Sequence, residues 1–178
     1  MSHVTTLSEH GSGETLAGSW HLDPERSRVE FRVGNLWGLA TVRGHFEDYH
    51  GRLDLSADPA VELTIGAASL ETGNRRRDRH LRSADFFAAD DHPQVRFASE
   101  SVVERGDTLM VRGRLLARGR SVPLELDARV RRVDGELAIE AGTTTPHREL
   151  GMTWSPFGVI SPRSEVRVEG HLVRQGAG

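Results

Sequence analysis

Apolar and polar residues alternate along most of this chain, a pattern typical of β-strands with one buried and one exposed face. In the first clear example Val29, Phe31 and Val33 share one face, and charged residues stand between them. Turn signals separate the alternating stretches, and the clearest is the hairpin dipeptide Asp134-Gly135. Strands are predicted over residues 27–33, 39–55 (a long, curved pair), 61–65, 95–103, 109–115, 122–133, 137–141 and 166–172.

About eight strands joined mostly by short turns predict an all-β domain, either an antiparallel barrel or a sandwich. A barrel of about this size can be solid or can hold one small ligand. No internal repeat and no second domain are evident in the sequence.

One stretch departs from the alternation, and it predicts a short helical insertion around residues 75–90. A Thr-Gly-Asn turn can cap a helix over residues 75–82, which lack proline and β-branched residues. Phe86 and Phe87 follow in a second short turn, which ends at a His-Pro dipeptide. Five arginines therefore lie beside two phenylalanines, which suits an amphiphile with an anionic head and an apolar tail. A solvated basic turn with a phenylalanine plug closing the β core fits the same residues.

Composition excludes several classes of function. The 178 residues carry a net charge of −3, which does not favour nucleic acid as a partner. All 23 residues of the Lys and Arg class are arginine, and a GC-rich coding sequence explains this bias better than selection for anion binding does. Cysteine is absent, which excludes disulfides, thiol catalysis and Cys-ligated metal centres.

The two ends of the chain are polar or glycine-rich. Residues 1–17 predict a disordered tail, residues 18–174 the barrel domain, and residues 175–178 a frayed end. No signal peptide and no apolar run of about 20 residues, the length of an integral membrane segment, stand in the sequence, so we expect a cytoplasmic protein.

Four motifs in order resemble the YceI-like family of polyisoprenoid-binding proteins over about residues 18–173. Residues 20–27 resemble the family's opening W-x-[IL]-D-P-x-H-S, with Arg26 where histidine is usual, and residues 41–46 resemble its V-x-G-x-F element. Residues 68–87, followed by His92-Pro93 and Phe97, resemble its most diagnostic run. Residues 113–124 are similar to a later G-x-L-T-[IL]-R-G-x-x-x-P-[VL] element.

The chain departs from the family pattern at two places. Leu116 stands where the later element usually has threonine. The family often has an arginine four residues before a C-terminal Phe-Gly; here either His147 occupies that place or Arg148 serves from the next position. Residues 152–158 suggest a sub-group with its own rim loop.

The resemblance implies a lipocalin-like antiparallel β-barrel with an elongated apolar tunnel for a polyprenyl chain or another long-chain amphiphile. It implies no catalysis and no cofactor, and the family often forms homodimers. Arginines at the mouth would hold a diphosphate head, and pairing with surface carboxylates is an equally good role for them. The ligand-binding residues implied are Phe31, Val33, Arg43, Leu63, Ile65, Arg79, Arg82, Phe86, Phe87, Phe97, Val111 and Leu126.

Three alternatives use the same residues differently. Nine histidines suggest metal or haem binding, but no HExxH, His-x-His or CxxCH motif is present. An enzyme acting on a similar amphiphile could use Asp78 and His80 near the arginine-rich loop, with Ser83 close by. A packed barrel could serve only as an interaction module. The ligand's length and head group are not fixed by the sequence.

Overall fold

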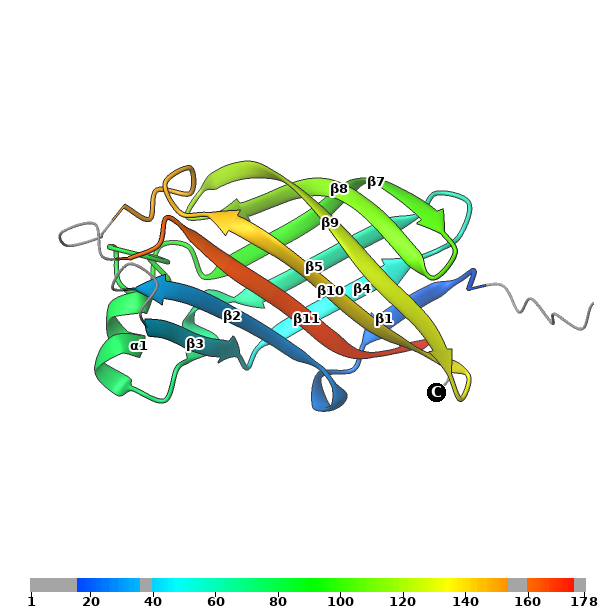
Figure 1. Ribbon diagram of the computed structural model, residues 1–178, viewed down its shortest axis with the longest axis horizontal. Coiled ribbons are helices and arrows are strands. Elements are labelled where there is room, and N and C mark those ends of the chain that lie inside the picture. The colour runs from blue at the N-terminus through cyan, green and yellow to red at the C-terminus, as the bar shows by residue number, and fades with distance from the viewer. Residues whose placement is uncertain (1–15, 36–39, 154–159, 175–178) are drawn as a thin grey trace, which may run out of the picture.

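Eight antiparallel strands close into a barrel in the computed structural model, which describes residues 16–35, 40–153 and 160–174 (Figure 1). The ring runs β1-β4-β5-β7-β8-β9-β10-β11, and pairing of β1 with β11 closes it. The strands of the ring are β1 (Ser19–Leu22), β4 (Tyr49–Asp54), β5 (Ala60–Gly66), β7 (Gln94–Arg105), β8 (Thr108–Ala117), β9 (Arg120–Val133), β10 (Glu136–Pro146) and β11 (Arg163–Arg174).

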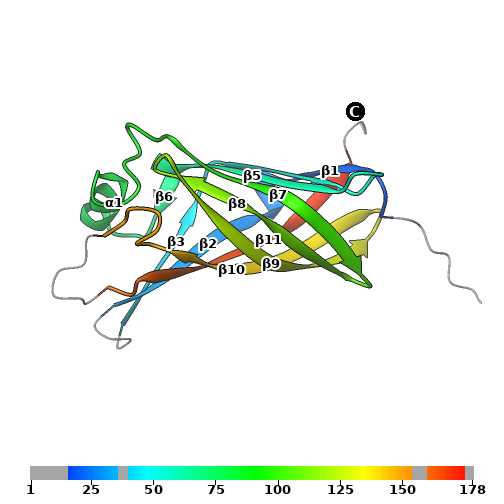
Figure 2. The same ribbon diagram turned by 90° about the horizontal axis from the view of Figure 1, so that it is seen from above.

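Besides β10, with which it pairs along most of its length, the last strand has two further partners. The C-terminal part of β11 pairs with β1, and its N-terminal part pairs with β2 (Arg28–Asn35). Strand β2 pairs with β3 (Ala40–Phe46), and β3 with the two-residue β6 (Leu70–Glu71). These three strands extend the wall at the end of the barrel that carries the helix, as Figures 1 and 2 show.

Tight turns join the neighbouring strands of the β7–β10 meander. Asp134 and Gly135 both have positive φ, 51° and 84°, which confirms the predicted two-residue hairpin between β9 and β10. The β8–β9 turn repeats the device at Arg118 and Gly119, with φ of 51° and 68°. Register is therefore set locally at these turns, and the alternating apolar residues then share one face.

The barrel interior is built from this alternation. On β8 Leu109, Val111, Leu115 and Ala117 are buried, while the residues between them are exposed except for Gly113. A Cβ at Gly113 would lie 2.8 Å from the Phe97 ring, so the aromatic side chain of β7 occupies the space that glycine leaves.

The single α-helix among the described residues is α1 (Arg75–Arg82), with the predicted bounds. The Asn74 side chain caps it by accepting hydrogen bonds from the backbone N–H of Arg76 and Arg77, both at 3.1 Å. The 3-10 helix η3 (Ala67–Ser69) and strand β6 lead into α1; a second 3-10 helix, η1 (Pro24–Arg26), joins β1 to β2. The helix lies at one end of the barrel (Figure 2).

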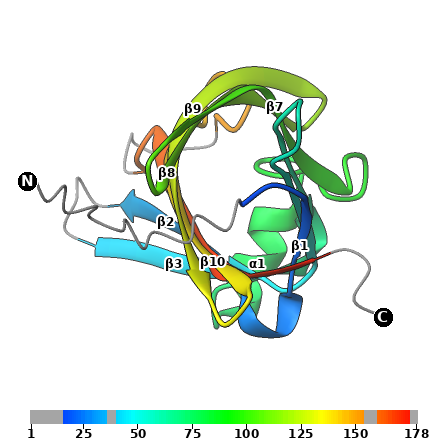
Figure 3. The ribbon, with the colours of Figure 1, turned by 90° about the vertical axis from the view of Figure 1, so that its right-hand side faces the viewer.

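The opposite end of the barrel is filled by side chains. Trp20 and Leu137 have no exposed surface, and Leu55 and Val130 are 4% and 2% exposed. The guanidinium of Arg174 stands 4.7 Å from the centre of the Trp20 ring, and the Trp20 indole N–H donates to the carbonyl of Leu16 at 3.0 Å. The four residues Trp20, Leu55, Val130 and Leu137 are called the plug below. Figure 3 views the barrel from this end.

Some predictions lie outside the described residues: nearly all of the predicted N-terminal tail (1–15), the predicted frayed end (175–178), residues 36–39 of an expected loop and most of the expected rim loop (154–159). In the described parts of the chain no helix is long and apolar enough to span a membrane. The short strands β1 and β6 were not predicted, because two to four residues are too few to show alternation.

Candidate ligand-binding cavity

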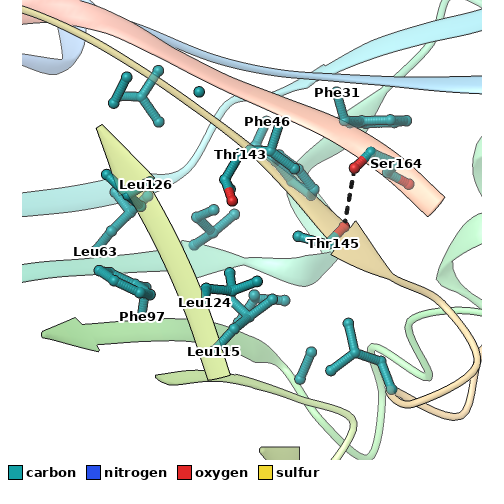
Figure 4. A pocket seen from close by; sticks show the side chains of 18 of the residues that line it. Phe31, Phe46, Leu63, Phe97, Leu115, Leu124, Leu126, Thr143, Thr145 and Ser164 are labelled. Carbon is teal, nitrogen blue, oxygen red and sulfur yellow. Dashed lines mark hydrogen bonds between the residues drawn. The ribbon is translucent and has the colours of Figure 1, made fainter. Parts of the chain in front are cut away.

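The barrel encloses a cavity of about 880 Å³ (Figure 4). Residues of β10 from Ile139 to Thr145 line it, so at a rise of about 3.3 Å per residue it extends about 20 Å along that strand. The plug residues Trp20, Leu55, Val130 and Leu137 are not part of the lining, so the cavity stops before them. Towards α1 it reaches the surface, because the exposed Asn74 and Arg76 line it.

Nine of the twelve residues predicted to bind ligand lie on the cavity wall: Phe31, Val33, Leu63, Ile65, Phe86, Phe87, Phe97, Val111 and Leu126. The structure brings these apolar side chains together from β2, β5, β7, β8, β9 and the turn after α1. Further apolar residues complete the wall, among them Leu115, Leu124, Ala128, Ile139, Ala141, Val166 and Val168.

The three predicted arginines lie off the wall. Arg82 donates to the carbonyl of Leu70 at 2.6 Å and to the carboxylate of Glu71 at 3.2 Å, so it ties α1 to β6. Arg79 is exposed on α1. Arg43 is exposed on β3 and stands in register with Arg32 of β2. Their contact with a ligand stays a prediction.

Two other arginines of α1 do line the cavity. Arg77 is held in place, because its Nε donates to the Thr72 hydroxyl at 2.8 Å and one Nη to the Thr72 carbonyl at 2.9 Å. Arg76 is exposed, and no hydrogen bond or ion pair of its side chain is found in the described part of the chain. Arg76 is therefore the cation at the mouth with its donors available.

Aromatic rings build the wall below the helix. The rings of Phe31 and Phe46 are 5.4 Å apart, and Phe87 meets Phe46 edge-on at 5.9 Å. His80 meets the buried Phe86 edge-on at 5.4 Å. A Cβ at Gly44 would come within 2.5 Å of the Phe31 ring, so this glycine provides space for the ring where β2 pairs with β3.

A polar stripe interrupts the apolar wall at the same end, and sequence analysis missed it. Along the inward face of β10 and at the turn residue after it, the side chains change from Leu137, Ile139 and Ala141 to Thr143, Thr145 and His147. The Thr145 hydroxyl donates to the Ser164 carbonyl at 3.5 Å, and His147 Nε2 is hydrogen-bonded to the Ser164 hydroxyl (Figure 4 shows the first of these contacts). The sequence does contain a signal for this stripe, because polar residues at positions 143, 145 and 147 continue the alternation of the apolar strand predicted over residues 137–141.

His147, not Arg148, is the residue that faces the cavity. His147 is 7% exposed and lines the wall, whereas Arg148 is exposed. Burial lowers the pKa of His147 below its ordinary value of 6.5, and a hydrogen bond to the Ser161 backbone only partly opposes this. The imidazole is therefore neutral at pH 7 and offers no cation to a ligand.

The lowered pKa of His147 predicts a pH dependence of stability. Below pH about 6.5 the unfolded chain binds a proton that the folded chain excludes from His147, so the free energy of unfolding falls as the pH falls. Urea denaturation at pH about 7.5 and about 5.5 should show a smaller fall for His147→Gln than for the wild type. His50→Gln, at an exposed position, is the control, and its free energy of unfolding should fall by as much as that of the wild type. A fall for His147→Gln equal to that of the wild type would contradict the prediction.

The pair invoked by the enzymatic alternative takes separate partners. The Asp78 carboxylate is 2% exposed and accepts hydrogen bonds from the N–H of Thr72 at 3.0 Å and from its hydroxyl. His80 Nε2 is 2.9 Å from the Asp85 carboxylate, and the Ser83 hydroxyl donates to the His80 carbonyl at 2.6 Å. Across the described residues, no group of three or more acidic or histidine side chains is placed to hold a metal ion.

Comparison with known sequences finds one family. The family model described as a YceI-like domain matches residues 20–172. A relative in Pectobacterium atrosepticum, UPF0312 protein ECA1782, is 36% identical over 137 residues, which are 73% of this chain and 69% of the relative. Protein YceI of Shigella flexneri is 35% identical over 125 residues, 67% of this chain and 65% of the relative. The chain thus spans about two thirds of the length of these relatives.

Solved structures share the fold. The Burkholderia cenocepacia protein BcnA superposes with a TM-score of 0.77 at 17% identity, covering 86% of this chain and 99% of BcnA. A polyisoprenoid binding domain from Saccharophagus degradans implicated in plant cell wall breakdown gives 0.73 at 15% identity, covering 88% and 98%. The Campylobacter jejuni YCEI protein gives 0.66 at 25% identity, covering 77% and 86%.

Proposed function

The chain belongs to the family of YceI-like domains, and we propose that it binds an isoprenoid-type lipid in its barrel and carries it without chemical change. The proposed ligand is a polyprenyl chain with or without a phosphate head. The observation that carries the proposal is the apolar cavity of about 880 Å³, which is closed by the plug and reaches the surface at α1. One neighbour in fold, the Saccharophagus degradans domain, is described as polyisoprenoid binding.

The volume suggests an upper size for the ligand. At about 30 Å³ per non-hydrogen atom, the share of a water molecule in the liquid, the cavity holds about 30 such atoms, or about six isoprene units. Each five-carbon unit moved from water to the apolar wall contributes about 4 kcal/mol, so a few buried units suffice for tight binding. Chains longer than this would extend past α1.

The polar residues at the mouth suggest how a head group is held. Arg76 offers guanidinium donors of the geometry that phosphate prefers, whereas Arg77 already donates to Thr72. We therefore place the phosphate of a charged ligand at Arg76 rather than at Arg79 or Arg82. The neutral stripe at Thr143, Thr145 and His147 offers hydrogen bonds to uncharged polar groups.

The proposal is tested by native mass spectrometry of the protein purified from its own host, followed by lipid extraction. We expect one polyprenyl species per chain, chemically unaltered by the protein, and the same spectrum reports whether the expected homodimer forms. A ligand-free mass, unchanged after incubation with geranylgeranyl diphosphate, would overturn the proposal. A chemically modified lipid would instead support the enzymatic alternative. The interaction-module alternative requires a packed interior, which a cavity of this size does not favour.

A further inference from the structure

The outer face of α1 carries cations without partners. Arg75, Arg76 and Arg79 are exposed, and none makes an ion pair or a side-chain hydrogen bond within residues 16–35, 40–153 and 160–174. The one acidic residue of the helix, Asp78, is buried and accepts from Thr72. These three arginines are called the arginine face below.

The acidic residues nearest in sequence do not neutralise this face. Glu71 accepts from Arg82, and Asp85 lies 2.9 Å from His80. Asp90 and Asp91 are exposed, and within the described residues neither forms an ion pair with these three arginines.

The arrangement is electrostatically unfavourable for the isolated helix. Arg75 and Arg76 stand in the first turn, where the helix dipole favours negative charge. Arg75 and Arg79 are four residues apart, so two like charges share one face. A densely negative partner would relieve both interactions.

The arginine face adjoins the mouth of the cavity. The cavity is lined by Arg76 of this face and by Asn74, Arg77, His80 and Leu81 of the same segment, while Arg75 and Arg79 do not line it. The helix therefore lies at the mouth of the cavity, with one face towards the cavity and the other towards solvent. It stands at one end of the barrel (Figures 1 and 2). An apolar chain that enters or leaves the barrel here crosses α1, and contact with a bilayer would spare it exposure to water.

We propose that the arginine face of α1 docks the mouth of the barrel on the surface of an anionic phospholipid bilayer. The choice of a bilayer rests on the proposed lipid-binding function. The whole chain has a net charge of −3, so an anionic surface repels it on average and attraction must come from a local patch.

The test is co-sedimentation of the full chain with vesicles. We expect binding to vesicles of phosphatidylglycerol mixed with phosphatidylcholine, weakening as salt is raised, and little binding to phosphatidylcholine alone. The double variant R75E/R79E should bind the anionic vesicles at least tenfold more weakly. Neither residue lines the apolar cavity, so uptake of uncharged geranylgeraniol, which has no anionic head, should remain as in the wild type.

The matched control is R105E/R131E, which reverses two exposed arginines outside α1. Equal losses in the two double variants, or equal binding to charged and neutral vesicles, would overturn the docking proposal. Vesicle binding without uptake of the polyprenyl probe would refute the lipid-binding function and leave the docking surface in place. Uptake without vesicle binding would refute docking alone.

Discussion

Replacing Ala141 by phenylalanine is expected to weaken binding of geranylgeranyl diphosphate by about a thousandfold. Ala141 lines the cavity and lies directly opposite Ala128 on β9, so these two small side chains leave room in the middle of the tunnel. A phenyl ring there blocks the tunnel in its middle, so about one isoprene unit of the chain that would lie beyond it stays in water. At about 0.8 kcal/mol per carbon the loss is about 4 kcal/mol, which is a factor of roughly a thousand in Kd. Titration followed by native mass spectrometry measures it.

The matched control is Ala138→Phe, the same substitution on the same strand. Ala138 is partly exposed and does not line the cavity, so its Kd should stay near the wild-type value. Urea denaturation of both variants checks that the barrel is still folded. We expect Ala141→Phe to fold, because the cavity has room for the new ring. An unchanged Kd in folded Ala141→Phe would mean that the chain binds elsewhere.

Much of the fold was predictable, because its determinants are local. Alternation along strands such as β8 and the Asp134-Gly135 turn specify strands and hairpins over a few residues. The bounds of α1 were predictable for the same reason, since Asn74 caps the helix from the preceding turn. The double pairing of β11 was not predictable, because it depends on where the barrel closes rather than on any run of residues.

The candidate site divides in the same way. Phe31, Leu63 and Phe97 could be assigned to the wall because, in a barrel strand whose apolar and polar residues alternate, the apolar residues point inward. The sequence could not show which arginines of α1 face the cavity, because five of the eight helix residues are arginine and only tertiary contacts distinguish them. Arg82 turns to β6, and Arg76 faces the mouth. The Ala141→Phe experiment tests whether the ligand occupies this wall.

The stability of the barrel should depend most strongly on its closed end. Trp20→Ala is expected to lower the free energy of unfolding by about 3–5 kcal/mol, measured by urea denaturation. The side chain has no exposed surface, the Arg174 guanidinium stands 4.7 Å from the centre of its ring, and its N–H donates to Leu16. Removing it leaves a void between β4 and β11, the two strands that β1 joins to close the ring.

Two further variants make the Trp20 result specific. Trp20→Phe keeps most of the ring but loses the hydrogen bond to Leu16, so we expect a smaller loss, about 1–2 kcal/mol. Leu116→Ala truncates a side chain that is 41% exposed and should cost less than about 1 kcal/mol. If Trp20→Ala cost no more than Leu116→Ala, the plug would not be what closes the barrel. The apolar packing at this end of the barrel would then come from Leu55, Val130 and Leu137 alone, which lie in the same buried core.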